Sequence, residues 1–193
     1  MGEGLGSRHR SPPIGGHPID ATELLMIRHG QSEANVGIAC APDCSLTELG
    51  LEQARGVAGR LRPLDLRGFS GVVSPYCRAV QTAREISAAT GVAFSEDEAV
   101  REWGATAVVG SRTFEKEPIE DVVVRLKAFL EARRGQRLVI VSHAAPIALL
   151  TQLAWDETPT IEGQFWVGSG GRCLGARVIP GHPRKRRRGP SAA

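Results

Sequence analysis

The fold is decided by the stretch Leu24-Leu25-Met26-Ile27-Arg28-His29-Gly30-Gln31-Ser32-Glu33-Ala34-Asn35. A short apolar run leads into a cation, an imidazole and a glycine, which is typical of a buried parallel strand that ends in a loop. Functional sites of open α/β sheets lie at such strand ends. A second apolar run, residues 137–142, ends in the same way at His143. We therefore predict that the two histidines converge on one ligand.

Alternating strand and helix patterns predict the rest of the domain. Strands are expected at residues 22–28, 71–74, 92–94 and 137–142, and helices at residues 48–62, 75–90, 119–134 and 146–155. A final hairpin is expected from residues 165–167 and 173–179, and residues 105–116 are expected to form a loop over the site. This order predicts an α/β three-layer sandwich with a mostly parallel central sheet, helices on both faces and room for an antiparallel edge strand.

Two helix starts carry recognisable capping residues. Ser45 has capping-box spacing to Glu48, and Thr47 is the alternative N-cap. Ser74 is expected to cap the helix that opens with Pro75, which places Arg78 in the first helical turn. The helix dipole and the guanidinium both favour an anion there.

Composition predicts one domain with two disordered ends. Residues 1–20 form a Gly- and Pro-rich leader, residues 21–180 the domain, and residues 181–193 a basic tail. The run Arg184–Arg188 accounts for the net charge of +3, because the remaining chain has 19 basic and 21 acidic residues. Nucleic acid binding is therefore expected, if at all, only from the tail.

The chain has no apolar run near the roughly 20 residues of a membrane span and no hydrophobic signal-peptide core, so a cytoplasmic location without membrane attachment is expected. The four cysteines are expected to be free thiols. Cys40 and Cys44 lack the second pair that a zinc site needs. No metal or cofactor is expected.

The candidate site combines groups that suit phosphoryl transfer. Two guanidinium forks can hold a tetrahedral dianion, one neutral imidazole can attack phosphorus, and the other can stabilise charge on the transferring oxygens. A carboxylic acid can protonate the departing alkoxide and then deprotonate water. The residues concerned are Arg28, His29, Arg78, Glu102 and His143, with Asn35 nearby.

Four motifs in order resemble the histidine phosphatase superfamily, the phosphoglycerate mutase-like proteins. They are Arg28 to Asn35, the block Leu46 to Ala54, the Ser-Pro…Arg-Ala…Gln-Thr-Ala block of residues 74–83, and Val141-Ser142-His143. Together they span about residues 22–150.

The resemblance implies a role for each matching residue. His29 becomes transiently phosphorylated, and Arg28, Arg78 and His143 form the phosphate pocket. Glu102 stands where the proton donor is expected, with Glu98 as the alternative.

The resemblance also implies further substrate contacts from Asn35, from Gln31 and from the backbone N–H of Ala144. Ala144-Ala145 departs from the family's usual Gly-Gly, and the two added Cβ atoms restrict the backbone and crowd the pocket floor.

The function expected from these residues is a metal-independent phosphomonoester hydrolase that acts on a small phosphorylated substrate through phosphohistidine. One alternative is a mutase that returns the phosphoryl group to a bound intermediate. The other, motivated by Ala144-Ala145, is a catalytically weak relative that binds a phosphorylated ligand.

Overall fold

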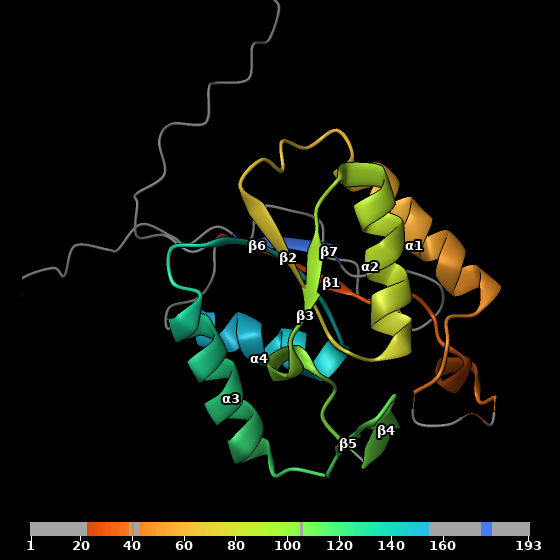
Figure 1. The fold of residues 1–193 in the computed structure, drawn as a ribbon, viewed down its shortest axis with the longest axis vertical. Helices are drawn as coiled ribbons and strands as arrows, with labels where there is room; N and C mark the ends of the chain where they lie inside the picture. Colours follow the sequence, from red (N-terminus) through yellow and green to blue (C-terminus); the bar gives the residue numbers. More distant parts are fainter. Residues whose placement is uncertain (1–22, 39, 41–42, 105, 155–174, 179–193) are drawn as a thin grey trace, which may run out of the picture.

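The computed structural model describes residues 23–38, 40, 43–104, 106–154 and 175–178 (Figure 1). The predicted leader at residues 1–20, the hairpin arm at 165–167, Cys173 and the tail at 181–193 lie outside these residues. Those predictions stay predictions.

A five-stranded sheet forms the centre of the domain, in the order β3-β2-β6-β1-β7. The strands are β1 (Glu23–Arg28), β2 (Phe69–Val73), β3 (Phe94–Glu96), β6 (Arg137–Ser142) and β7 (Gly175–Val178). Strands β1, β2, β3 and β6 pair in parallel, whereas β7 pairs with β1 antiparallel. The predicted parallel sheet and the antiparallel edge strand are both confirmed.

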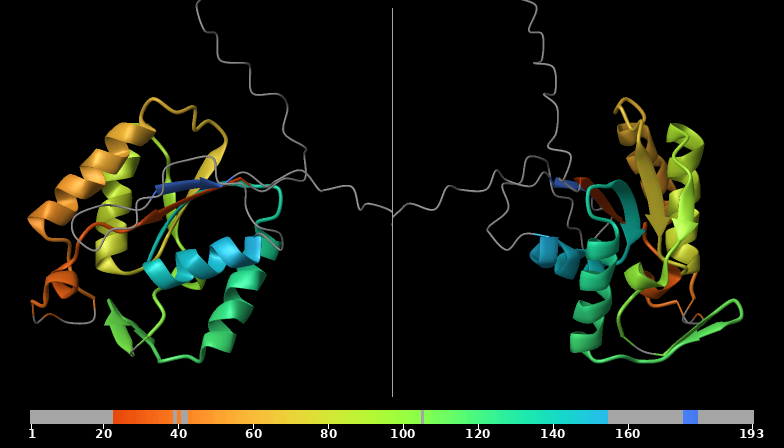
Figure 2. Two further views of the ribbon diagram at one scale, coloured as in Figure 1. Left: turned by 180° about the vertical axis from the view of Figure 1, so that it is seen from behind. Right: turned by 60° about the vertical axis from the view of Figure 1, so that its left-hand side comes forward.

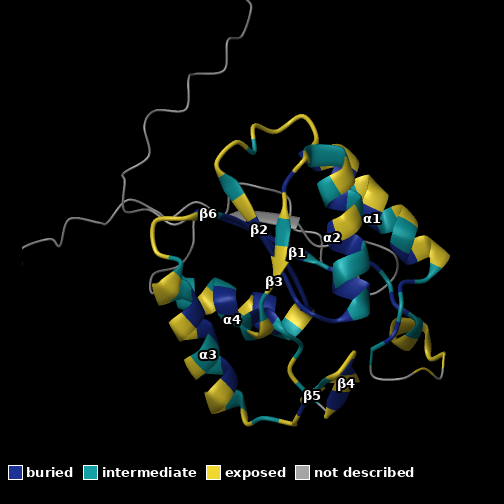
Figure 3. Cartoon of the chain, viewed as in Figure 1, coloured by how far each residue is buried: buried dark blue, intermediate teal, exposed yellow. Residues whose placement is uncertain are grey.

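Helices cover both faces of this sheet, which gives the three predicted layers (Figure 2). The helices are α1 (Glu48–Leu61), α2 (Cys77–Thr90), α3 (Ile119–Ala132) and α4 (Ala144–Ala154), with 3-10 turns η1 (Glu33–Val36) and η2 (Glu98–Val100). Side chains of β1 alternate between the layers: Leu24 and Met26 pack with α3 and α4, and Leu25 and Ile27 pack with α1 and α2. The buried stripes of the helices accordingly face the sheet (Figure 3).

The segment expected to be a loop over the site forms a hairpin instead. Strands β4 (Ala107–Val109) and β5 (Arg112–Phe114) pair antiparallel around Gly110, which has φ +60°. Val109 and Phe114 form a small buried cluster with Tyr76. Two strands of three residues each are too short to show a periodic pattern, which explains why the prediction was wrong.

Several predicted boundaries shift by a few residues. The third strand runs over Phe94–Glu96 instead of residues 92–94, and α4 begins at Ala144, two residues before Pro146. Thr47 is the N-cap of α1, where its hydroxyl accepts from the Gly50 N–H at 3.0 Å.

The N-cap of α2 is Tyr76, and the predicted Ser74 cap is wrong. The Asp43 Oδ1 atom, from a distant loop, accepts from the N–H of Cys77, the first residue of the helix. This carboxylate therefore satisfies a backbone donor that no local side chain reaches.

The prediction of free thiols is wrong for two of the cysteines. Cys40 and Cys44 form a disulfide with their Cα atoms 5.7 Å apart, and Cys77 is a free thiol. A spacing of four residues in a loop is compatible with a disulfide as well as with two thiols, so the sequence could not decide. Among the described helices, none has the length and apolarity needed to span a membrane.

Candidate active site

The site lies at the carboxyl ends of β1 and β6. The register pairs Arg28 with Ser142, so that His29 and His143 each follow the last paired residue of adjacent parallel strands. The His29 N–H donates to the Ser142 carbonyl at 3.0 Å. Both imidazoles are buried, and their ring centroids lie 5.0 Å apart in an edge-on arrangement. The structure therefore brings the two predicted histidines together.

The hydrogen bonds of His29 leave its ring in one tautomer. Nδ1 lies 2.6 Å from the Gly30 carbonyl, which can only accept, so Nδ1 carries the proton. Nε2 then has a lone pair and accepts from Arg78 Nε at 3.2 Å. Burial and then the charge of Arg78 lower the pKa of His29 to about 3. His29 is thus neutral near pH 7, with Nε2 in the form that can attack phosphorus.

His143 is oriented by a residue whose role the sequence did not reveal. Its Nε2 lies 2.7 Å from the Ser74 hydroxyl, and that oxygen already accepts from the Tyr76 N–H at 3.4 Å. When the hydroxyl proton points at Nε2, the imidazole carries its own proton on Nδ1. Nδ1 has no hydrogen-bond partner among the described residues and lies 3.4 Å from Glu102 Oε2.

The surroundings of His143 also keep it neutral. Burial lowers its pKa well below 6.5, and the positive charges of Arg78 and Arg28 add to this effect. A neutral imidazole with a proton on Nδ1 can donate to an oxygen in front of it. It is therefore suited to stabilise charge on a transferring group.

Two guanidinium groups supply the positive charge. Arg78 is the second residue of α2 and is buried, with Nη2 3.9 Å from Glu102 Oε2 and its Cζ atom 4.7 Å from the centroid of the Tyr76 ring. Arg28 ends β1 and lies close enough for its charge to lower the pKa of both histidines. The predicted position of Arg78 in the first helical turn is confirmed.

Glu102 is the carboxyl group beside the histidines, with Oε2 3.4 Å from His143 Nδ1. Its side chain is 30% exposed, and desolvation raises its pKa above the ordinary value of 4.5, against the opposing charges of Arg78 and Arg28. The alternative donor Glu98 is 53% exposed and pairs with Arg112 at 3.6 Å. The geometry therefore favours Glu102 as the proton donor, because a raised pKa keeps more of the acid form available.

Three further residues, Gln31, Asn35 and Ala144, are predicted to contact the substrate. Gln31 Oε1 accepts from the Thr47 hydroxyl at 2.9 Å, which ties the loop after β1 to α1. Asn35 is exposed in η1, where its Oδ1 accepts from the Ser32 N–H at 3.0 Å. Ala144 is exposed at the start of α4. No described contact joins these three to the histidine cluster, so their role as substrate contacts stays a prediction.

Donor atoms of His29, Glu102 and His143 lie within 4.8 Å of one another, a spacing that could hold a metal ion. Arg28 and Arg78 act on the same three groups as positive charges. Their cationic field favours an anion over a divalent cation at this position.

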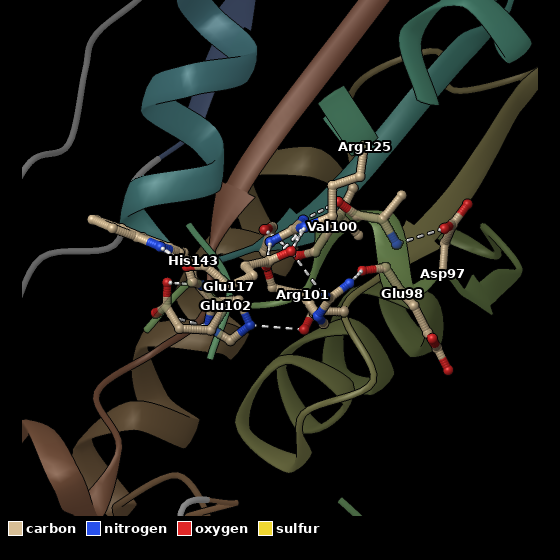
Figure 4. A network of polar contacts seen from close by, with 12 residues as sticks. Asp97, Glu98, Val100, Arg101, Glu102, Glu117, Arg125 and His143 are labelled. Atoms are coloured by element: carbon tan, nitrogen blue, oxygen red, sulfur yellow. Dashed lines mark hydrogen bonds and ion pairs between the residues drawn. The ribbon is translucent and has the colours of Figure 1, made fainter. Parts of the chain in front are cut away.

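Sequence reasoning missed Ser74, Glu117 and Arg125. The sequence indicates a helix cap at Ser74, because this residue precedes Pro75, whereas the structure places its hydroxyl 2.7 Å from His143 Nε2. Glu117 and Arg125 form an ion pair at 2.7 Å beside the loop that carries Glu102 (Figure 4). No local spacing rule links the end of a loop to the middle of the following helix.

Comparison with known proteins gives the same family as the four sequence motifs. The histidine phosphatase superfamily, branch 1, matches residues 24–118. A 2,3-bisphosphoglycerate-dependent phosphoglycerate mutase from Methylobacterium sp. (strain 4-46) is 26% identical over 181 residues, with 75% of this chain and 87% of the mutase covered.

Solved structures of phosphatases share the fold. A mycobacterial glucosyl-3-phosphoglycerate phosphatase has 27% identity and a TM-score of 0.53, with 68% of this chain and 78% of that chain covered. A phosphoserine phosphatase from Entamoeba histolytica, in complex with 3-phosphoglyceric acid, has 21% identity and a TM-score of 0.51, with 68% and 79% covered. At that lower identity the likeness concerns the fold alone.

Proposed function

This chain belongs to the histidine phosphatase superfamily, and we propose that it hydrolyses phosphomonoesters through a phosphohistidine on His29, without a metal ion. The observation that carries the proposal is the state of His29. Its Nδ1 proton is held by the Gly30 carbonyl, while the Nε2 lone pair faces Arg78 and the ring lies 5.0 Å from His143.

In the first step, His29 Nε2 attacks phosphorus while the bond to the ester oxygen breaks. Glu102, in its acid form, gives its proton to the departing alkoxide. Arg28, Arg78 and His143 Nδ1–H donate to the phosphoryl oxygens, and their charge and dipoles stabilise the transition state. The products are an alcohol and phosphorylated His29.

In the second step, water attacks the phosphorus of phosphorylated His29. Glu102, now a carboxylate, takes a proton from the water, and the P–N bond breaks. Inorganic phosphate leaves, and His29 and Glu102 return to their starting protonation states. The charge of the two arginines supplies the stabilisation that a metal ion supplies in other phosphatases.

A mutase is the second candidate, because a relative with 26% identity carries that activity in its name. A mutase returns the phosphoryl group to a bound intermediate, and it must therefore enclose that intermediate while excluding water. Only about ten residues separate Asn35 from the Leu-Thr-Glu start of the next helix, a short connection for such an enclosure. This supports hydrolysis over transfer.

A phospho-ligand-binding protein without turnover is the third candidate, and Ala144-Ala145 motivates it. It retains the anion pocket of Arg28 and Arg78 and predicts no covalent intermediate. A single-turnover experiment separates it from an enzyme, because only an enzyme yields acid-labile phosphate on His29.

The test is a panel of phosphomonoesters that includes 3-phosphoglycerate, phosphoserine and glucosyl-3-phosphoglycerate, with the His29→Ala variant as the blank. We expect phosphate release from at least one ester by the wild type and none by the variant. Movement of the phosphoryl group between carbons of 3-phosphoglycerate without phosphate release would favour the mutase. Stable binding with neither result would favour the binding protein.

A further inference from the structure

Glu102 lies between two residues that are both held by Glu117. On one side, Arg101 Nη2 donates to Glu117 Oε2 at 2.8 Å. On the other side, Trp103 Nε1 donates to the Glu117 carbonyl at 3.0 Å. The residues before and after the carboxyl group are therefore attached to one point, and Glu102 projects toward His143 (Figure 4).

Arg125 on α3 completes the attachment. Its Nη2 atom donates to Glu117 Oε1 at 2.7 Å and to the Arg101 carbonyl at 3.2 Å. The same guanidinium donates to the carbonyl of Ala99. One planar group thus fixes the backbone on both sides of Val100, two residues before Glu102.

The loop is also fixed from the strand that carries His143. Val100 is fully buried, and its carbonyl accepts from the Ser142 hydroxyl at 2.7 Å. Ser142 ends β6 and directly precedes His143. The position of Glu102 relative to His143 is therefore determined by a continuous set of hydrogen bonds from α3 to β6.

We propose that Glu117 and Arg125 are positioning residues that hold Glu102 in place for proton transfer to the leaving group. This inference rests on the proposed hydrolysis through His29. Neither residue makes a hydrogen bond or an ion pair with His29 or His143 in the described structure. The positive charge of Arg125 also helps to lower the pKa of His143, so the charge-conserving variant Arg125→Lys separates this effect from the positioning of Glu102. Both side chains are 13% exposed, and removal of the Glu117 carboxylate would leave the charges of Arg125 and Arg101 poorly solvated.

The experiment compares two substrates that differ in their need for an acid. Glycerol phosphate releases an alkoxide that must be protonated, whereas p-nitrophenyl phosphate releases a stable phenolate. The quantity measured is kcat/KM, which for both esters reports the step that forms phosphohistidine.

We expect Glu117→Gln to lower kcat/KM for glycerol phosphate about tenfold or more, and for p-nitrophenyl phosphate less than about threefold. Glu102→Gln should give the same selective pattern with a larger effect, because it removes the acid itself. The matched control is Glu131→Gln on α3, the helix that carries Arg125, where the ion pair of Glu131 with Arg134 is 68% exposed on both sides. It should change neither rate.

Equal losses with both substrates, or no loss with either, would overturn the proposal. If Glu117→Gln does not fold, Arg125→Lys answers the same question, since it keeps the charge but loses the planar fork that reaches two carbonyls. A wild type that releases phosphate neither from these two esters nor from any ester of the phosphomonoester panel would contradict the proposed function itself. A wild type that hydrolyses both, with an unchanged substrate ratio in the variants, would contradict only the positioning role.

Discussion

The Ser74 hydroxyl lies 2.7 Å from Nε2 of the buried His143. Since Ser74 follows β2 and His143 follows β6, two neighbouring strands supply the ring and the group that orients it. The pairing resembles the way in which metal-binding and catalytic imidazoles have one nitrogen held so that the other has a defined role.

We expect Ser74→Ala to lower kcat about tenfold or more and the free energy of unfolding by about 1–3 kcal/mol, because a buried ring nitrogen loses its partner. Single-turnover phosphorylation and chemical denaturation measure the two effects. Ser70→Ala, at an exposed position of β2, the strand that precedes Ser74, is the control and should change neither. Wild-type rates in the Ser74 variant would show that the hydroxyl does not set the tautomer.

The depressed pKa of His29 predicts a dependence of stability on pH. The folded protein keeps His29 neutral down to about pH 3, whereas the unfolded chain protonates it near pH 6.5. Its contribution is therefore fully present above pH 6.5 and is lost as the pH falls toward 3. Between pH 7 and pH 5 the loss amounts to about 2 kcal/mol.

Chemical denaturation at pH 7 and pH 5 tests this dependence. The decrease in the free energy of unfolding should be about 2 kcal/mol smaller in His29→Gln than in the wild type. The two proteins differ only at position 29, so the difference between the two decreases reports the imidazole of His29 and its effect on His143. Equal decreases would mean that His29 titrates normally in the folded state.

The contact between Gly50 and the loop after β1 predicts that alanine substitution has opposite effects on stability at two glycines of α1. A Cβ atom at Gly50 would lie 2.0 Å from the Gln31 carbonyl oxygen, whereas one at Gly59 would meet nothing within 4 Å. We expect Gly50→Ala to lower the free energy of unfolding by about 1–3 kcal/mol. Gly59→Ala should raise it by about 0.5–1 kcal/mol, because alanine favours the helix.

Denaturant titration of the two glycine variants makes the comparison within one helix. Because Gly50 packs against the segment that carries His29, the Gly50 variant should also lose activity. Similar stabilities for both variants would indicate that the loop moves aside at little cost.

The hydrogen bond between Asp43 and the first residue of α2 predicts that a distant loop contributes to the stability of this helix. Its Oδ1 atom accepts from the Cys77 N–H at 2.5 Å, one residue before Arg78. Asp43→Ala should cost about 1 kcal/mol of stability, whereas Asp43→Asn keeps an acceptor and should cost much less. Thermal denaturation of both variants measures the difference, and equal losses would rule out a capping role.

The parallel sheet and the proximity of the two histidines could be predicted because each histidine directly follows an apolar run in the sequence. The runs before His29 and His143 are apolar and similar in length, and parallel neighbours end at one edge of the sheet. The four motifs predicted the family, which the comparisons confirm. The predicted edge strand was found at β7.

The missed features depend on contacts between distant segments. A serine hydroxyl before a proline can cap a helix or bind another side chain, and only the fold shows that the Ser74 hydroxyl lies beside Nε2 of His143. The ion pair of Glu117 and Arg125 joins a loop to a helix. Helical periodicity does not relate the two residues, because Glu117 lies outside the helix. The hairpin at residues 107–114 is stabilised by the stacking of Phe114 on Tyr76, a residue far away in the sequence.

The pairing of Arg28 with Ser142 has a consequence for how this protein can change. Because backbone hydrogen bonds of the sheet set the spacing between the two imidazoles, this spacing does not depend on the loops of the domain. A segment outside this pairing, such as the hairpin at 107–114, can be exchanged or lengthened to suit a new ester while the reactive centre keeps its dimensions.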